Sequence, residues 1–197
     1  RTTKRRRQDM KLVHCDDPIL SKVLADVDIE NPGFDIKETA TRMKVLMNSQ
    51  KGLGLSACQV GLDYKMFIMG QEANVAVFIN PEVVSVSVEE EIDVEGCLSF
   101  PDMFVKIPRP TTVEAKWFDE DLQPQAKEFT GYAARCFLHE FDHLHGVVYK
   151  QKVSRLKWER AEKKKVKIQK QRLNMMKYME ILQKQNEKEL AEIEAAK

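Results

Sequence analysis

Residues 131–146 read GYAARCFLHEFDHLHG and contain the pattern His139-Glu140-Phe141-Asp142-His143. The stretch predicts a helix from about Gly131 to Leu144, with Gly146 as its stop. Two histidines four residues apart on a helix share one face, with Cβ atoms about 6 Å apart, so both imidazoles can bind one metal ion. Glu140 lies beside them and can act on a water molecule that the metal binds. The simpler interpretation is that these histidines merely face the core or the solvent. Two histidines that flank a glutamate at this spacing nevertheless favour a metal site.

The third ligand decides the class of site. A metzincin pattern requires another histidine where the chain has Tyr149, so that pattern fails. A thermolysin-like protease requires a downstream glutamate, but Glu159 and Glu162 lie in a lysine-rich segment typical of a solvated helix.

A better third ligand precedes the histidines. Cys97 lies in the segment Glu95-Gly96-Cys97-Leu98-Ser99, and a thiolate is a good ligand for zinc or iron. Two imidazoles, one thiolate and one open position indicate a catalytic site rather than a closed structural one. The remaining cysteines are expected to be free thiols that pack as small hydrophobic residues: Cys15, Cys58 and Cys136.

A glycine-containing segment, Gly52–Gln59 (GLGLSACQ), follows the first expected helix. Two glycines this close permit a bound peptide to approach the backbone, although an ordinary turn would be the preferred interpretation of this segment alone. It lacks the Gly-Lys-Ser/Thr ending of a phosphate-binding loop.

Taken in this order, the three segments resemble the peptide deformylases, which show GφGφAAxQ, EGCLS and HExDH, with φ apolar. The resemblance covers roughly His14 to Tyr149. Ser56 stands where alanine is usual, and we expect this difference to affect packing rather than chemistry. Phe104 stands where many bacterial members carry arginine, which affects expected contacts with later residues of the substrate.

The resemblance implies a function and a mechanism. The enzyme would remove the N-formyl group from the starting formylmethionine of nascent polypeptides. Cys97, His139 and His143 would hold Fe²⁺, although Zn²⁺, Ni²⁺ or Co²⁺ would suit the same ligands. Hydroxide on the metal would attack the formyl carbon, with Glu140 as general base and then acid. Gln59 and the backbone N–H of Leu98 would stabilise the oxyanion.

The resemblance also implies where the substrate binds. The methionine side chain would enter an apolar pocket near Leu53, Tyr132, Arg135 and Cys136, with Arg135 contributing its aliphatic stem. The peptide backbone would run past two glycines, Gly54 and Gly96. Glu95 and Arg109 would form a buried ion pair that stiffens the EGCLS segment. For Asp142, a supporting role and a plain surface charge both remain open.

Two alternative functions use the same residues differently. An HExxH metallopeptidase would use Glu140 in the same way on an unformylated peptide. A metal-stabilised module that binds RNA or the ribosome would hold metal without turnover, and Glu140 would then have no function.

Charge is distributed unevenly over the 197 residues, of which 43% are hydrophobic and 32% charged. Residues 1–11 carry +5, residues 12–150 carry −11 and residues 151–197 carry +7. We therefore expect a disordered basic extension (1–11), a catalytic domain (12–150) and a basic helical tail (151–197). Basic segments at both ends of an acidic domain favour binding of these segments to a polyanionic partner.

The expected fold is α+β, with antiparallel or mixed sheets around a central helix that carries HExxH. Asp35 and Glu38 predict the start of an earlier helix, and alternating residues between Tyr64 and Trp117 predict strands. No Gly or Pro occurs from Val153 to Lys197, which predicts one long charged helix.

The expected setting is the cytoplasm, because no secretory signal or membrane-spanning run is evident and the cysteines suit a reducing compartment. We expect a monomer whose substrates are N-formylmethionyl nascent peptides. Some bacterial deformylases dock on the ribosome through a basic C-terminal helix. The similar tail here predicts ribosomal RNA as a partner.

Overall fold

The computed structural model describes the backbone of residues 9–195 and the side chains of residues 9–187. The chain forms two compact units, which meet in the sequence between Ser154 and Arg155. The expected extension at residues 1–11 lies mostly outside the described residues.

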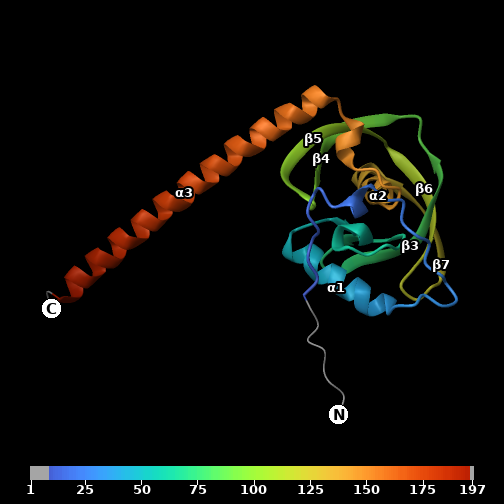
Figure 1. Ribbon diagram of the computed structural model, residues 1–197, viewed down its shortest axis with the longest axis horizontal. Helices are drawn as coiled ribbons and strands as arrows, with labels where there is room; N and C mark the ends of the chain where they lie inside the picture. Colours follow the sequence, from blue (N-terminus) through green and yellow to red (C-terminus); the bar gives the residue numbers. More distant parts are fainter. Residues whose placement is uncertain (1–8, 196–197) are drawn as a thin grey trace, which may run out of the picture. The chain divides into compact units, whose positions relative to one another are not determined.

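In its described residues, 9–154, the first unit holds two α-helices and seven strands. Figure 1 shows their arrangement. The helices are α1 (Ile36–Ser49) and α2 (Gly131–Leu144). The strands are β1 (Gly54–Ser56), β2 (Met66–Gln71), β3 (Asn74–Val86), β4 (Glu90–Cys97), β5 (Phe100–Pro110), β6 (Thr112–Phe118) and β7 (Pro124–Thr130). Short 3-10 turns occupy Pro18–Ser21, Ala57–Val60 and Tyr149–Lys152.

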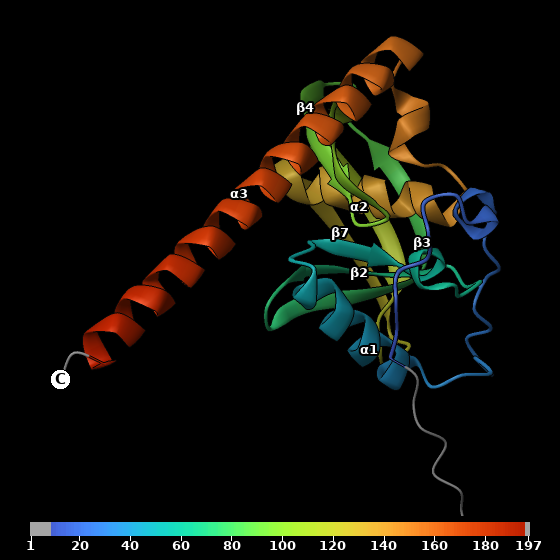
Figure 2. The ribbon, with the colours of Figure 1, turned by 60° about the vertical axis from the view of Figure 1, so that its left-hand side comes forward.

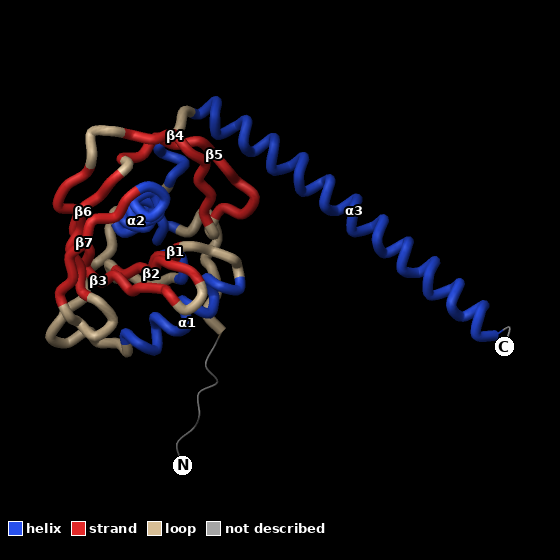
Figure 3. The backbone as a smooth tube through the Cα atoms, turned by 180° about the vertical axis from the view of Figure 1, so that it is seen from behind, coloured by secondary structure: helices blue, strands red, loops and turns tan. Residues whose placement is uncertain are grey.

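The strands form two antiparallel sheets. One has five strands in the order β1-β2-β3-β6-β7, and the other is the hairpin β4-β5. Figure 3 shows α2 end-on, with β1 and β2 on one side of it and β4 and β5 on the other. The expected α+β fold around a central helix is therefore confirmed.

The first helix begins where its sequence predicts. The carboxylate of Asp35 accepts a hydrogen bond from the Glu38 backbone N–H at 2.8 Å, which satisfies one free donor of the first turn. The buried side of α1 packs into a core with residues of β2 and β3 (Figure 2). That side consists of Ile36, Ala40, Met43 and Met47.

The bounds of α2 match the predicted helix. Gly146 follows it with φ +69°, a left-handed conformation that glycine adopts without strain. A Cβ at this position would also lie 2.6 Å from the carbonyl oxygen of Ser21. Phe137 anchors the helix, with its ring 5.3 Å from Phe67 and 5.2 Å from Phe129. Helix α2 is thus a rigid, buried support for the histidines.

The second unit is α3 (Arg155–Ala195), the single long helix that the sequence predicts. Among the described residues, no helix combines the length and the apolar character needed to cross a bilayer.

Candidate metal centre

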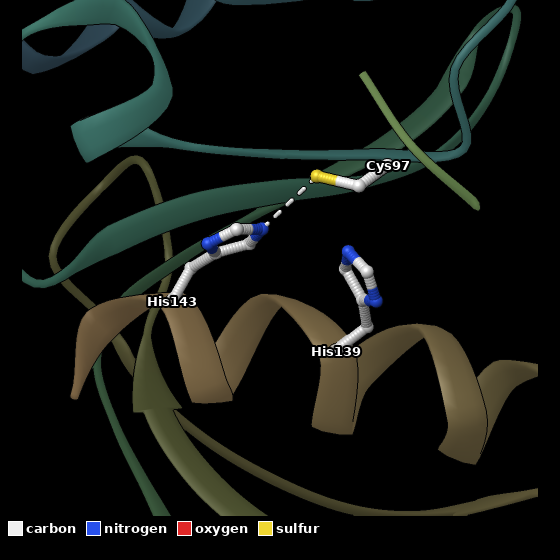
Figure 4. Close-up of side chains that lie close together, drawn as sticks. All are labelled: Cys97, His139 and His143. Atoms are coloured by element: carbon white, nitrogen blue, oxygen red, sulfur yellow. Dashed lines mark hydrogen bonds between the residues drawn. The ribbon is translucent and has the colours of Figure 1, made fainter. Parts of the chain in front are cut away.

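Cys97, His139 and His143 converge although the cysteine lies more than forty residues before the histidines. Cys97 is the last residue of β4, and the histidines lie one turn apart on α2 (Figure 4). Their ligand atoms all lie within 4.8 Å of one another, and the Cys97 Sγ is 3.3 Å from the His143 Nε2. The central position of α2 beneath the end of the β4-β5 hairpin brings the three together.

Glu95 fixes the orientation of His139. Its carboxylate Oε2 lies 3.0 Å from the His139 Nδ1, so the other ring nitrogen is left to face Cys97. Such a carboxylate–histidine contact sets the tautomer of a metal-binding imidazole. Burial opposes ionisation of Glu95, but hydrogen bonds from Arg109 and His139 outweigh it and hold its pKa at about 2.

The expected ion pair between Glu95 and Arg109 is present and buried. The Arg109 guanidinium donates two hydrogen bonds to Glu95, at 2.8 and 2.9 Å, in bidentate geometry. It also donates to Asp142 at 2.6 Å, so Asp142 is a direct partner of Arg109. Arg135 adds a second cation, with its Nη1 2.9 Å from Glu95. Removing one member would leave buried charge without its partner, which typically costs about 3–5 kcal/mol.

The donor set fits a divalent metal ion. Burial lowers the pKa of His143 well below its usual value, so its imidazole is neutral, the form that binds metals. A thiolate and two imidazoles are ligands that iron and zinc both accept. Cys97, His139 and His143 could therefore hold such an ion together.

Gln59 lies beside this cluster with its amide held at both ends. Its Nε2 is 3.3 Å from the Cys97 Sγ and 3.1 Å from the Ser99 Oγ. Its Oε1 accepts a hydrogen bond from the Ser56 backbone N–H at 2.8 Å. The amide N–H group is therefore presented toward the cluster, where it could stabilise negative charge.

Glu140 is buried next to the histidines, and Ser56 contacts it directly. The Ser56 hydroxyl lies 2.7 Å from the Glu140 Oε2 and 3.1 Å from its backbone carbonyl oxygen. Burial raises the pKa of Glu140, while the Ser56 hydrogen bond acts against that rise. The sequence predicts that Ser56 affects packing rather than chemistry, and the structure adds a hydrogen bond from its hydroxyl to this carboxylate.

Gly54 explains why the first motif needs a glycine at this point. A Cβ there would collide with the Glu140 carboxyl group. At Gly96, a Cβ would lie 2.7 Å from the Phe104 ring. Both glycines therefore let another side chain pack directly against the backbone, Glu140 at Gly54 and Phe104 at Gly96.

A cavity of about 380 Å³ opens over these groups. The substrate residues inferred from the sequence all line it, together with Cys97, Gln59, Leu98, His139 and Glu140: they are Leu53, Gly54, Gly96, Tyr132, Arg135 and Cys136. The cavity also has a wall formed by residues 100–104, of which the sequence singled out only Phe104.

Arg135 illustrates how a charged residue can line such a cavity. Its guanidinium donates to Glu95 and to the carbonyl oxygens of Ile107 at 2.9 Å and Glu91 at 2.6 Å. Because the charged end is bound beneath the hairpin, the aliphatic stem is the part left for the cavity.

Comparisons with known proteins point to one family. The family model of polypeptide deformylase matches residues 9–159. The peptide deformylase of Rhizobium meliloti (strain 1021) is 36% identical over 151 residues, which are 74% of this chain and 86% of the relative. That of Thermotoga maritima is 39% identical over 140 residues, covering 70% and 83%.

A solved structure gives the same result for the fold. The crystal structure of a peptide deformylase from Synechococcus elongatus in complex with actinonin aligns with a TM-score of 0.74 and 32% identity. The alignment covers 84% of this chain and 91% of that chain. The fold, the sequence motifs and the length of the match all indicate the same family. The chain therefore belongs to the polypeptide deformylase family.

Proposed function

We propose that Cys97, His139 and His143 hold one divalent metal ion and that Glu140 moves the protons in the deformylase reaction. The enzyme is a hydrolase that removes the N-formyl group from nascent polypeptides. The observation that carries our assignment is the convergence of one thiol and two imidazoles beside a buried carboxylate at a cavity wall.

A bound divalent ion would supply Lewis acidity, which lets water lose a proton near neutral pH and polarises a carbonyl group. Glu140 accepts the proton of the attacking water and delivers it to the leaving amine. Gln59 Nε2 and the backbone N–H of Leu98 stabilise the negative charge that develops on the formyl oxygen. Removing one such donor typically raises the barrier by about 3 kcal/mol.

The substrate's methionine side chain binds in the cavity beside Leu53, Tyr132, Cys136 and the stem of Arg135. The peptide backbone passes Gly54 and Gly96, which lie beside the Glu140 carboxyl group and the Phe104 ring. Residues 12–150 are the catalytic domain in this proposal and residues 151–197 are a tail. The cytoplasm is the compartment in which such an enzyme meets nascent chains.

The test is formate release from formyl-Met-Ala-Ser by protein purified without oxygen, with its metal content measured in parallel. We expect turnover of this peptide and none of unformylated Met-Ala-Ser. Cleavage of unformylated peptides would instead favour an HExxH metallopeptidase. Bound metal without any turnover would favour a binding module.

We propose Fe²⁺ as the working metal, with Zn²⁺, Ni²⁺ and Co²⁺ as alternatives. Activity should then decay in air and persist under nitrogen, because oxidation of the ion or of Cys97 inactivates the site. Protein loaded with Ni²⁺ or Co²⁺ should survive longer in air. Equal half-lives in air and nitrogen would point to zinc.

Replacing Ser56 with alanine should slow turnover without weakening substrate binding. The Glu140 carboxylate would lose a hydrogen bond at 2.7 Å. Hydrogen bonds to charged groups are typically worth about 1.5–3 kcal/mol, so kcat should fall by roughly tenfold or more with KM unchanged. In the unaltered chain the Ser56 hydrogen bond stabilises the ionised form of Glu140. Its loss should therefore raise the pKa of Glu140 and shift the acid limb of the pH profile to higher pH.

The Ser56→Ala protein should fold, since alanine is the usual family residue at this position. Ser49→Ala, at the exposed end of α1, is the matched control and should leave both kcat and the pH profile unchanged. An unchanged kcat and acid limb in Ser56→Ala would show that the hydroxyl only fills space.

The basic tail is proposed to bind ribosomal RNA. Residues 152–177 hold eleven Lys or Arg and only two acidic residues. A basic face of α3 gathers five of them: Arg160, Lys163, Lys167, Lys170 and Lys177. Segregation of this charge from an acidic catalytic unit favours binding to a polyanion over a role in solubility alone.

Deleting residues 157–197 should leave turnover of a short formyl-peptide within a few-fold of the full chain. The same deletion should sharply reduce co-sedimentation with ribosomes at low salt. Binding of the full chain should weaken steeply with salt, because each neutralised phosphate releases counterions. Equal co-sedimentation of the two proteins would show that the tail is only a solvated helix.

A further inference from the structure

Helix α3 carries a line of residues at alternating spacings of three and four, which we call the seam. Its apolar members include Met175 and Met179, which are 61% and 58% exposed. The seam spans three heptads and consists of Lys165, Ile168, Arg172, Met175, Met179, Leu182 and Asn186. Four of the seven are apolar (Ile168, Met175, Met179 and Leu182), and apolar residues at this period are the pattern by which two helices pack as a coiled coil.

The seam is distinct from the basic face. At 3.6 residues per turn, Lys163, Lys167 and Lys170 fall on the far side of the helix from Met175 and Met179. The positions that flank the seam are mostly uncharged glutamines: Gln169, Gln171, Gln183 and Gln185. A second helix could therefore approach the seam without meeting a row of lysines.

The charges of α3 favour one orientation of such a pair. Residues 155–172 hold nine basic and two acidic residues, whereas residues 183–195 hold two basic and four acidic residues. A parallel pair of identical helices would place the basic halves together. An antiparallel pair places each basic half along the acidic end of the other helix, which is the favourable arrangement.

The seam is also symmetric about Lys177, as an antiparallel pair requires. In that register Met175 lies opposite Met179 of a second copy, Arg172 opposite Leu182, and Ile168 opposite Asn186. Position 165, a lysine, comes opposite position 189 of the second copy, which is a glutamate in the sequence. The methionines meet at the centre, where their flexible side chains can fill the contact.

We propose that α3 binds α3 of a second copy of this chain, antiparallel and centred on Lys177, so that the protein is a dimer in solution. The proposal replaces the monomer expected from the sequence and does not depend on the catalytic assignment. The pairing covers Met175 and Met179, which the helix otherwise leaves exposed, and it leaves the basic face open.

Sedimentation equilibrium of the full chain should give twice the 22.8 kDa monomer mass at micromolar concentrations. Met179→Glu should weaken the dimer by at least about tenfold, because it would bury an unpaired charge at the centre of the contact. Ile181→Glu is the matched control, since Ile181 is 54% exposed on the far side of the helix. It should leave the dimer intact, and both variants should keep the formate-release activity of the unaltered chain.

Cysteine cross-linking tests the orientation. A chain with both Ile168→Cys and Asn186→Cys should form disulfides between position 168 of one copy and position 186 of the other, identified by peptide mapping. Ile168→Cys alone should not link to itself at position 168. A full chain that stays monomeric, equal effects of the two glutamate variants, or a 168–168 link would each overturn the proposal.

Discussion

Alanine in place of Cys97, His139 or His143 should give a protein that neither retains metal nor releases formate from a formylated peptide. The three ligand atoms lie within 4.8 Å of one another, so each replacement removes one of three ligands. A divalent ion held by two side chains is bound far more weakly than one held by three. Activity should drop to the background of the assay, and metal content should fall with it.

Matched variants separate loss of a ligand from loss of packing. Cys58 is fully buried close to His143, and its Sγ is 3.7 Å from the carbonyl oxygen of that residue. His145 caps the same helix. Cys58→Ala and His145→Ala should therefore retain metal and most activity. Circular dichroism should show that all these variants keep their helices.

One result would reject the assignment of Cys97. If Cys97→Ala retained metal and near-normal deformylation, the ion would be held by the histidines and another group. A protease-like site would then be the better description. Loss of metal together with loss of deformylation would support the three-residue site.

The helices could be predicted from local sequence because their signals are local. Asp35 caps α1, Gly146 ends α2, and the absence of Gly and Pro permits the length of α3. The sequence does not predict strand β7, because this strand carries no local strand pattern. Within Pro124–Thr130 only Phe129 is buried, so an edge strand shows no alternation of apolar and polar residues.

The site was predictable where a motif carries its own geometry. The spacing of His139 and His143 fixes their common face, and EGCLS supplies the cysteine. The role of Ser56 could not be read in this way, because its partner Glu140 lies 84 residues further along the chain. Likewise, the contacts of Glu95 with Arg135 and His139 join two elements, β4 and α2, that only the folded structure brings together.

Glu140→Gln should lower kcat by at least about 10²-fold while the protein keeps its metal. Glutamine has the shape of glutamate but cannot accept a proton, so the variant removes general acid–base catalysis alone. The Ser56 hydroxyl can still donate to the amide oxygen at position 140, which preserves the local geometry. Cys97, His139 and His143 are untouched, so metal content should stay near that of the unaltered chain.

Metal content and kcat have to be measured on the same variant. A drop in both metal and kcat would mean that Glu140 supports the fold of the site, not the proton transfer. Glu38→Gln, in the first turn of α1, is a carboxylate-to-amide control that should change neither quantity. If Glu140→Gln kept its metal and turned over formyl-Met-Ala-Ser at an undiminished rate, water would attack without this carboxylate. The proposed proton transfers would then have to be assigned to another group.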